Sequence, residues 1–173
     1  MGKVGLSAYS HQLFHINWSY PMAKATTAKY EQMILEVEWT DGSDTYTNVC
    51  GLVDVTINRT SNIDTSEIPD CTDESKPLSI ERQVRSQEVT VSASGVWALS
   101  SHQNMLAWWR AGTTLNVRLR NAKVESDGAT DDIYAESGPA ILVSLNNGRT
   151  KGQKVSAEVE IQFDGVPATA LVV

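Results

Sequence analysis

Residues 155–163, Val-Ser-Ala-Glu-Val-Glu-Ile-Gln-Phe, alternate between apolar and polar side chains without a break. A period of two is typical of a β-strand that turns one face to a core and the other to water. The apolar row predicts the core face of this strand. The opposite row predicts its polar face and consists of Ser156, Glu158, Glu160 and Gln162.

The same alternation recurs upstream and predicts further strands. It occupies residues 33–39, 53–57, 89–97 and 115–119. Asp41-Gly42 favours a tight turn after the first of these segments. Residues 140–145 are apolar on both faces, which is expected of a strand that is covered on both sides.

One short α-helix is predicted over about residues 100–111. Ser100 and Gln103 have the spacing of a capping box, in which each side chain satisfies a backbone donor of the first turn. Gly112 fits the left-handed position just past the end of the helix. Together with the strands, this helix predicts a mainly β fold: an antiparallel β-sandwich or barrel with one short flanking α-helix.

Residues from about 60 to 79 lose the alternation and are predicted to form a long loop. Loops of this length in compact domains are usually functional or disordered. A solvated loop without a role is the alternative interpretation. The candidate functional residues in this stretch are its acidic ones, Asp64, Glu67, Asp70, Asp73 and Glu74.

The composition is that of a globular protein. The chain has 173 residues, of which 41% are hydrophobic and 20% are charged. These values fit one domain and exclude collagen-like, low-complexity and largely disordered classes. The sequence has no run of about 18 apolar residues, so we expect no membrane span. The first residues lack the apolar stretch of a secretory signal.

The net charge of the chain argues against a protein that binds nucleic acid tightly. The chain carries 14 Lys and Arg against 21 Asp and Glu, a net charge of −7, and residues 31–85 hold 12 of the acidic but only 4 of the basic side chains. Proteins that bind phosphates usually present a basic face. The acidity indicates a surface that repels nucleic acid, complementary patches between subunits, or simple solubility.

The sequence contains no set of residues that predicts an enzyme. Apart from His102, the histidines lie within the first 21 residues, and no nucleophile–base pair or phosphate-binding glycine loop occurs. We therefore expect no catalytic residue, no metal and no cofactor. Cys50 and Cys71 form no CxxC pair and are expected to be free thiols.

Residues 1–30 are interpreted as an N-terminal arm or extension, and residues 31–173 as the β domain. Within the arm, residues 14–20 alternate and could form a strand. Residues 22–24, Met-Ala-Lys, also read as an ordinary protein start. The alternative is therefore that the residues before them are a mis-assigned start.

Several short sequence motifs occur in a fixed order along the chain. Gly-Leu-Val-Asp-Val-Thr-Ile-Asn at 51–58 is followed by Val-Thr-Val-Ser-Ala-Ser-Gly-Val-Trp at 89–97 and Ala-Trp-Trp-Arg-Ala-Gly at 107–112. Leu-Asn-Val-Arg-Leu-Arg and Gly-Pro-Ala-Ile-Leu-Val-Ser-Leu-Asn-Asn-Gly precede the final alternating strand. From about Glu31 to Pro167, this order resembles the major tail tube protein of tailed bacteriophages.

The resemblance implies a structural virion protein of the tail. Members of that family form hexameric rings that stack into a hollow tube, in which the sheets of neighbouring subunits join into a barrel. Genomic DNA passes through the lumen without specific binding. The resemblance implies other tail proteins as partners (terminator, tape measure, tail tip or sheath) and assembly in the host bacterial cytoplasm.

Under this resemblance, Ser156, Glu158, Glu160 and Gln162 are candidates to face the lumen, and the acidic residues of the long loop are candidates to contact the next ring. The alternative is that this polar row points outward. The lumen would then be lined by Asp54, Thr56 and Asn58, or by Glu88 and Thr90. A contractile and a non-contractile tail are equally compatible with the sequence. The other functional class is a monomeric carbohydrate- or receptor-binding β-sandwich, for which Trp108 is a candidate exposed aromatic residue.

Overall fold

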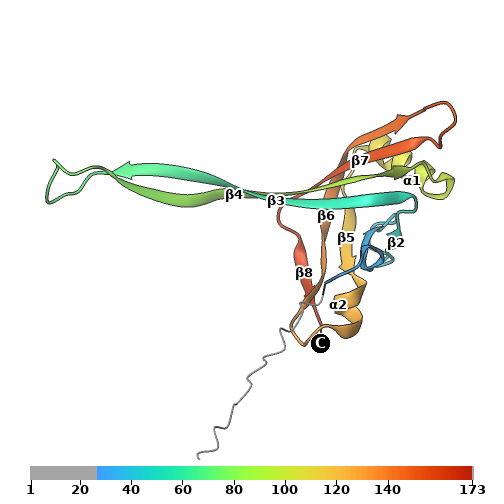
Figure 1. The fold of residues 1–173 in the computed structure, drawn as a ribbon, viewed down its shortest axis with the longest axis horizontal. Coiled ribbons are helices and arrows are strands. Elements are labelled where there is room, and N and C mark those ends of the chain that lie inside the picture. The colour runs from blue at the N-terminus through green and yellow to red at the C-terminus, as the bar shows by residue number, and fades with distance from the viewer. Residues whose placement is uncertain (1–26, 173) are drawn as a thin grey trace, which may run out of the picture.

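The computed structural model describes residues 27–172 (Figure 1). The strands are β1 (Met33–Val37), β2 (Thr47–Asn48), β3 (Leu52–Ile68), β4 (Ser79–Val96), β5 (Leu115–Asn121), β6 (Ile133–Gly148), β7 (Ser156–Phe163) and β8 (Ala168–Leu171). The helices are the 3-10 turn η1 (Tyr30–Gln32), α1 (Leu99–Ala111) and α2 (Ala122–Asp127). The strands form one antiparallel sheet in the order β2-β1-β5-β6-β7-β4-β3, with β8 also paired to β6. The predicted mainly β, antiparallel class is confirmed, whereas most of the predicted arm, residues 1–26, lies outside the described residues.

Strand β6 joins the two halves of the sheet. Its residues 135–140 pair with β5, and residues 140–148 pair with β7. A register shift between Leu142 and Ser144 marks a bulge, at which a strand bends. Strand β8 continues the line of β7 along the first half of β6. Because the sheet turns at β6, β1 and β5 face β4 and β7 across a common core, as the layers of a sandwich do.

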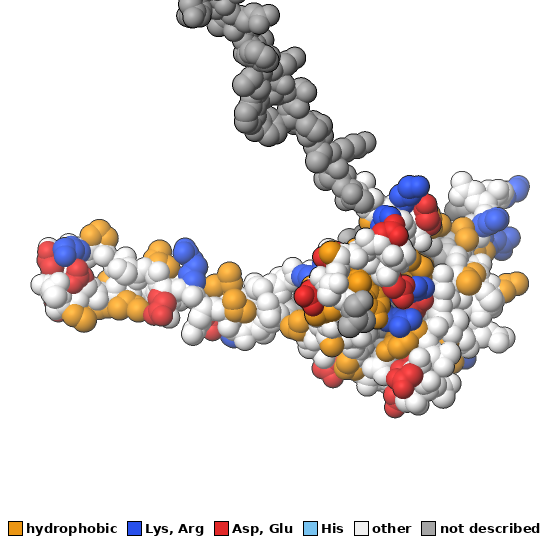
Figure 2. Space-filling model, turned by 90° about the horizontal axis from the view of Figure 1, so that it is seen from below, with side chains coloured by type: hydrophobic (Ala, Val, Ile, Leu, Met, Phe, Trp, Pro, Cys, Tyr) orange, Lys and Arg blue, Asp and Glu red, His pale blue; other side chains and the backbone are white. Residues whose placement is uncertain are grey.

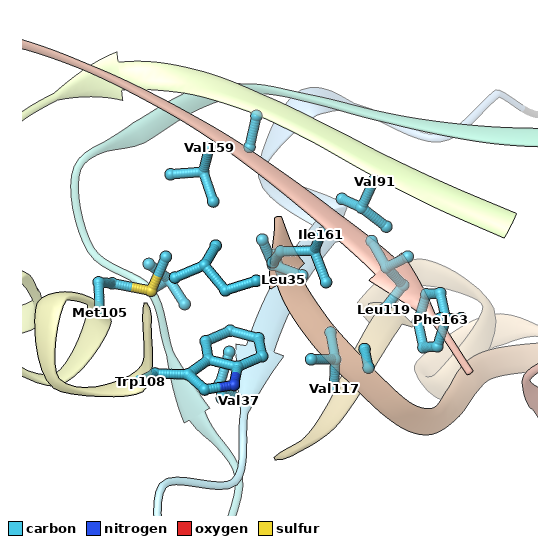
Figure 3. Packing of buried hydrophobic residues seen from close by; sticks show 14 of the residues in the cluster. Leu35, Val37, Val91, Met105, Trp108, Val117, Leu119, Val159, Ile161 and Phe163 are labelled. Carbon is cyan, nitrogen blue, oxygen red and sulfur yellow. The ribbon is translucent and has the colours of Figure 1, made fainter. Parts of the chain in front are cut away.

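The core lies between these two halves (Figure 3). The side chains of the core that are 0% exposed are Val37, Val91, Val117, Ala140 and Ile161. Met105 and Trp108 of α1 close one end of the cluster, and each is only 3% exposed. The apolar residues of β7 are all buried. The core face that the alternation of residues 155–163 predicts is therefore confirmed.

The start of α1 differs from the prediction. The N-cap residue is Ala98, which has no side-chain hydrogen bond to offer, so the predicted capping box at Ser100 and Gln103 is wrong. The backbone N–H of Trp97 still donates to the carbonyl of Val155 at 2.9 Å, in line with the β4–β7 ladder. Only Trp97 and Ala98 lie between β4 and α1, so the helix starts ahead of Ser100.

The end of α1 agrees with the prediction. Gly112 has a φ of 59° in the left-handed region, and its N–H donates to the carbonyl of Trp108 at 3.1 Å. The helix α2, by contrast, was not predicted. Its signal is a capping asparagine at the last residue of β5, because Asn121 Oδ1 accepts from the N–H groups of Lys123 at 3.1 Å and Val124 at 3.2 Å.

The predicted loop over about residues 60–79 is wrong, because β3 and β4 pair almost to its end. The ladder runs from Leu52 opposite Gly95 to Ile68 opposite Ser79, so only residues 69–78 connect the strands. Asp64 and Glu67 are therefore strand residues. The alternation is lost here because no core lies against this part of the hairpin, while backbone pairing needs no apolar row.

The prediction that residues 140–145 are covered on both faces is also wrong for the single chain. Ala140 and Leu142 are buried, but Ile141 is 42% exposed and Val143 is 47% exposed. The side chains of Ile141 and Val143 are thus available to another surface.

Ile161→Ala should lower the free energy of unfolding by about 2–5 kcal/mol, because it leaves a cavity at the centre of the core. Urea denaturation of the unassembled protein measures this change. Ile141→Ala is the matched control at a half-exposed site, and we expect a loss of about 1 kcal/mol or less there. Equal losses at both sites would show that the core is placed incorrectly.

Candidate functional site: a polar sheet face and a projecting hairpin

Polar side chains of four adjacent strands share one face of the sheet, on the side away from the core. Residues that lie directly opposite each other in a ladder point to the same side of the sheet. The rows that cross β3, β4, β7 and β6 in turn are Asp54–Ser94–Glu158–Asn146 and Thr56–Ser92–Glu160–Ser144. Asn58, Thr90 and Gln162 lie opposite one another in the next row. These residues together are called the polar face below.

The lumen candidates that the sequence offered as alternatives lie together on this face. Glu158, Glu160 and Gln162 of β7 share it with Asp54, Thr56 and Asn58 of β3 and with Thr90 of β4. Ser156 lies at its end, opposite Val96 and Gly148, and Glu88 continues it outward opposite Thr60. Alternation in the sequence separates the two faces of a strand, but it does not say which strands are neighbours.

The polar face is concave and acidic. The first two rows line a single hollow in the surface of the sheet. The face carries the carboxylates of Asp54, Glu158 and Glu160 and no Lys or Arg. Ser94 donates its hydroxyl to Asp54 Oδ2 at 3.4 Å. The hollow therefore has a negative potential that no neighbouring cation on the same face neutralises.

Two edges of this four-stranded region have no partner within the described residues. No strand pairs with the outer edge of β3. On the side of β6 that pairs with β5, the ladder stops at Ala140 opposite Leu115, so residues 141–148 are unpaired there. Unpaired edges expose backbone donors and acceptors that can bond to a strand of another chain.

The outer part of the β3–β4 hairpin, residues 60–88, projects from the body and is called the hairpin arm (Figure 1). The ladder between β4 and β7 ends at Thr90 opposite Gln162, so the arm has no third strand. At its base, Nη2 of Arg59 donates to Glu136 of β6, at 2.7 Å to Oε1 and 2.6 Å to Oε2. This ion pair ties the root of the arm to the body.

The hairpin arm has one side that is richer in apolar side chains and one that is polar. On the first side, Ile63 lies opposite Val84, and Ile80 follows towards the tip; these side chains are 55%, 58% and 55% exposed. On the polar side, Nδ2 of Asn62 donates to Ser86 Oγ at 3.0 Å and to Glu88 Oε1 at 3.2 Å. The apolar side chains have nothing to pack against in the single chain.

Two aspartates order the connection at the tip. Asp70 Oδ1 accepts from the hydroxyl of Thr72 at 2.6 Å and from its N–H at 2.8 Å, and Nζ of Lys76 lies 2.9 Å from Asp70 Oδ2. These donors, led by the hydroxyl of Thr72, lower the pKa of Asp70 from 3.8 to about 2. Asp73 accepts in the same way from Ser75, which also lowers the pKa of Asp73.

A second cluster of charges serves to hold β1 to β5. Glu36 is only 5% exposed and lies 2.7 Å from Nη2 of Arg118 and 3.1 Å from Nη2 of Arg120. Glu38, also buried, accepts from Nδ2 of Asn116 at 2.8 Å, and this bond lowers the pKa of the Glu38 carboxyl. Because these charges are paired or hydrogen-bonded, the cluster is structural.

The remaining candidates from the sequence have structural surroundings. Trp108 is buried and donates Nε1 to the carbonyl of Thr113 at 2.8 Å, so its proposed exposure in a carbohydrate site is wrong. His102 stacks against Trp97 with 3.5 Å between ring centroids. Cys50 and Cys71 are free, as predicted, and both are exposed.

Two searches of residues 27–172 gave negative findings. No three His, Cys, Asp or Glu side chains are grouped so that they could hold a metal ion. No helix in this part of the chain is long and apolar enough to cross a membrane.

A concave, water-exposed sheet face between two unpaired strand edges is typical of a structural subunit that assembles through its sheet. The sequence matches the phage tail tube protein family over residues 27–169, and the chain belongs to that family. It is a structural protein of the tail tube of a virion. None of the curated proteins compared with the chain matches it in sequence.

Solved structures share this fold at low sequence identity. A chain from the tail of an empty GTA particle, refined with C6 symmetry, has a TM-score of 0.64 and 12% identity over 83% of this chain and 99% of that one. The SPP1 tail tube gives 0.61 and 9% identity over 83% and 80%. The PVC sheath-tube complex of an extracellular contractile injection system, in its extended state, gives 0.55 and 12% identity over 94% and 100%.

Thr72→Val should raise the pKa of Asp70 from about 2 towards 3.8, because it removes the strongest donor to that carboxylate. The stabilisation that Asp70 gives the tip is present above pH 3.8 and is lost as the pH falls towards 2, so the variant should lose it at a higher pH. Carboxyl-carbon NMR measures the titration. Ser75→Ala is the control, since it should alter Asp73 alone. If Asp70 titrates as before in Thr72→Val, the tip geometry is wrong.

Proposed function

We propose that the chain assembles into six-membered rings that stack into a hollow tube, and that the polar face lines its lumen. The observation that carries this proposal is the concave face with Asp54, Glu158 and Glu160 and no basic side chain. Fixed carboxylates repel passing DNA over a distance that salt limits to about 10 Å at 0.1 M. Bound phosphates would stall a genome that has to slide.

The free edges support closure of the ring. Successive pairing of β6, β7, β4 and β3 is antiparallel at every step, so β3 runs opposite to β6. When copies stand side by side in the same orientation, β3 of one therefore meets β6 of the next as an antiparallel pair. Such a contact would satisfy both edges and extend the polar face around the ring. The C6 symmetry of the related GTA tail supports a ring of six.

The same function implies further partners. Terminator, tape measure and tail tip proteins would meet the ends or the interior of the tube, and a sheath would surround it in a contractile tail. Assembly would take place in the cytoplasm of the host bacterium, where the exposed thiols of Cys50 and Cys71 stay reduced.

Changing Glu158 and Glu160 to Lys should leave tubes intact but slow DNA ejection and lower infectivity, because the cations would hold phosphates against the wall. Infectivity of phage complemented with the variant, with tubes counted by electron microscopy, measures this effect. Glu158→Gln with Glu160→Gln is the control that removes charge without adding cations. Unchanged infectivity with intact Lys-bearing tubes would show that the polar face points outward.

Replacing residues 64–83 by Asn-Gly should abolish tube formation and leave the fold intact. Ile63 and Val84 are paired, so a two-residue turn can close the shortened hairpin between them. The core begins only at Val89, and the melting temperature should therefore stay close to that of the full chain. Light scattering and thermal melting measure the two effects. If full-length tubes still form, the hairpin arm is a passive insertion.

A further inference from the structure

Two exposed segments carry opposite charge of equal size. Residues 67–78, at the tip of the hairpin arm, have four acidic residues and one Lys, a net charge of −3. The turn between β6 and β7, residues 149–155, has three basic residues and no acidic one, a net charge of +3. The basic residues of this turn are Arg149, Lys151 and Lys154. The chain as a whole is acidic, so a turn of this composition departs from the average.

The two segments lie at opposite ends of the strands. The β6–β7 turn lies beside the end of β4, because Ser156 pairs with Val96 and with Gly148. The tip lies beyond Ile68 and Ser79, at the other end of the same ladder. The hairpin arm and the turn accordingly point in opposite directions from the body (Figure 1). Charged side chains gather at the far end of the arm, and Lys and Arg side chains lie on the side of the body away from it (Figure 2).

Most of these charges have no partner within one chain. At the tip, Lys76 pairs with Asp70, but Glu67 and Glu74 take part in no ion pair among residues 27–172. Arg149, Lys151 and Lys154 are exposed and are likewise unpaired within this range. Their charges are therefore free to meet a second molecule.

We propose that the acidic tip of the hairpin arm in one copy docks on the basic β6–β7 turn of a copy in the adjacent ring. This inference rests on the proposed stacking of rings. Head-to-tail stacking brings opposite ends of identical subunits together, and here those ends have complementary charge.

The contact also fixes the polarity of the stack. A reversed ring would set tip against tip or turn against turn, and like charges that face each other oppose association. Single exposed ion pairs contribute only about 0–1 kcal/mol. Because the contact is repeated by every subunit of a ring, the summed free energy of these ion pairs favours stacking. Salt screens exposed charges, so the contact should weaken as the salt concentration rises.

The test uses two charge-reversed variants of the full chain. The tip variant is Glu67→Lys with Glu74→Lys, and the turn variant is Lys151→Glu with Lys154→Glu. None of these side chains is buried, so both variants should melt like the wild type. Each variant alone presents like charges at the contact and should give about tenfold less sedimentable tube than the wild type at low salt.

An equimolar mixture of the two variants should restore tubes, because the Lys-bearing tip of one matches the Glu-bearing turn of the other and the reverse contact is also matched. Glu31→Lys with Asp41→Lys, the same change in charge on the body, is the control and should assemble normally. The inference is overturned if either variant alone assembles like the wild type, or if the mixture does not restore tubes. A wild-type chain that forms no tubes at all would overturn the proposed function itself.

Discussion

Backbone pairing along β6 is the constraint on which the rest of the structure depends. One strand of 16 residues serves β5 and β8 with its first half and β7 with its second, with a bulge between Leu142 and Ser144. Because the strand bends, a single sheet can cover both sides of one core. The core therefore needs no second sheet to close it. The strands β3, β4 and β7 keep the face opposite the core exposed to water. The concave polar face is thus a consequence of how the core is closed.

Carboxylates have different surroundings in the two halves of this sheet. Behind β1 and β5, Glu36 is compensated by two arginines and Glu38 accepts hydrogen bonds, so the carboxylates there stabilise local structure. On the polar face, Glu158 and Glu160 have no cationic neighbour on the same surface. No local structure of the single subunit depends on these two charges. A function that depends on a negative surface offers a physical reason for their presence.

The sequence predicted the parts that a core dictates and missed those that it does not. The alternation of residues 155–163 and the left-handed Gly112 follow from local rules, and both were confirmed. The strand that runs through Asp64 and Glu67 was missed, because a hairpin without a third strand needs no apolar row. The lumen candidates could be named strand by strand, but adjacency comes from long-range pairing, and therefore their union in one face could not be predicted. Whether that face lines a lumen stays a prediction.

The hairpin arm is difficult to explain for a protein that acts alone. A two-stranded ribbon in water is marginally stable at best, since it has no layer to bury its apolar side chains. Here Ile63, Ile80 and Val84 are more than half exposed, and the ion pair of Arg59 with Glu136 holds only the root. The acidic tip opposes pairing of one arm with another, because like charges would meet. In the proposed stack, the basic β6–β7 turn of a copy in the adjacent ring neutralises the tip. Burial of the apolar side against other copies in the tube would add to the stability of the arm, and the growth of the tube would then be coupled to the order of the arm.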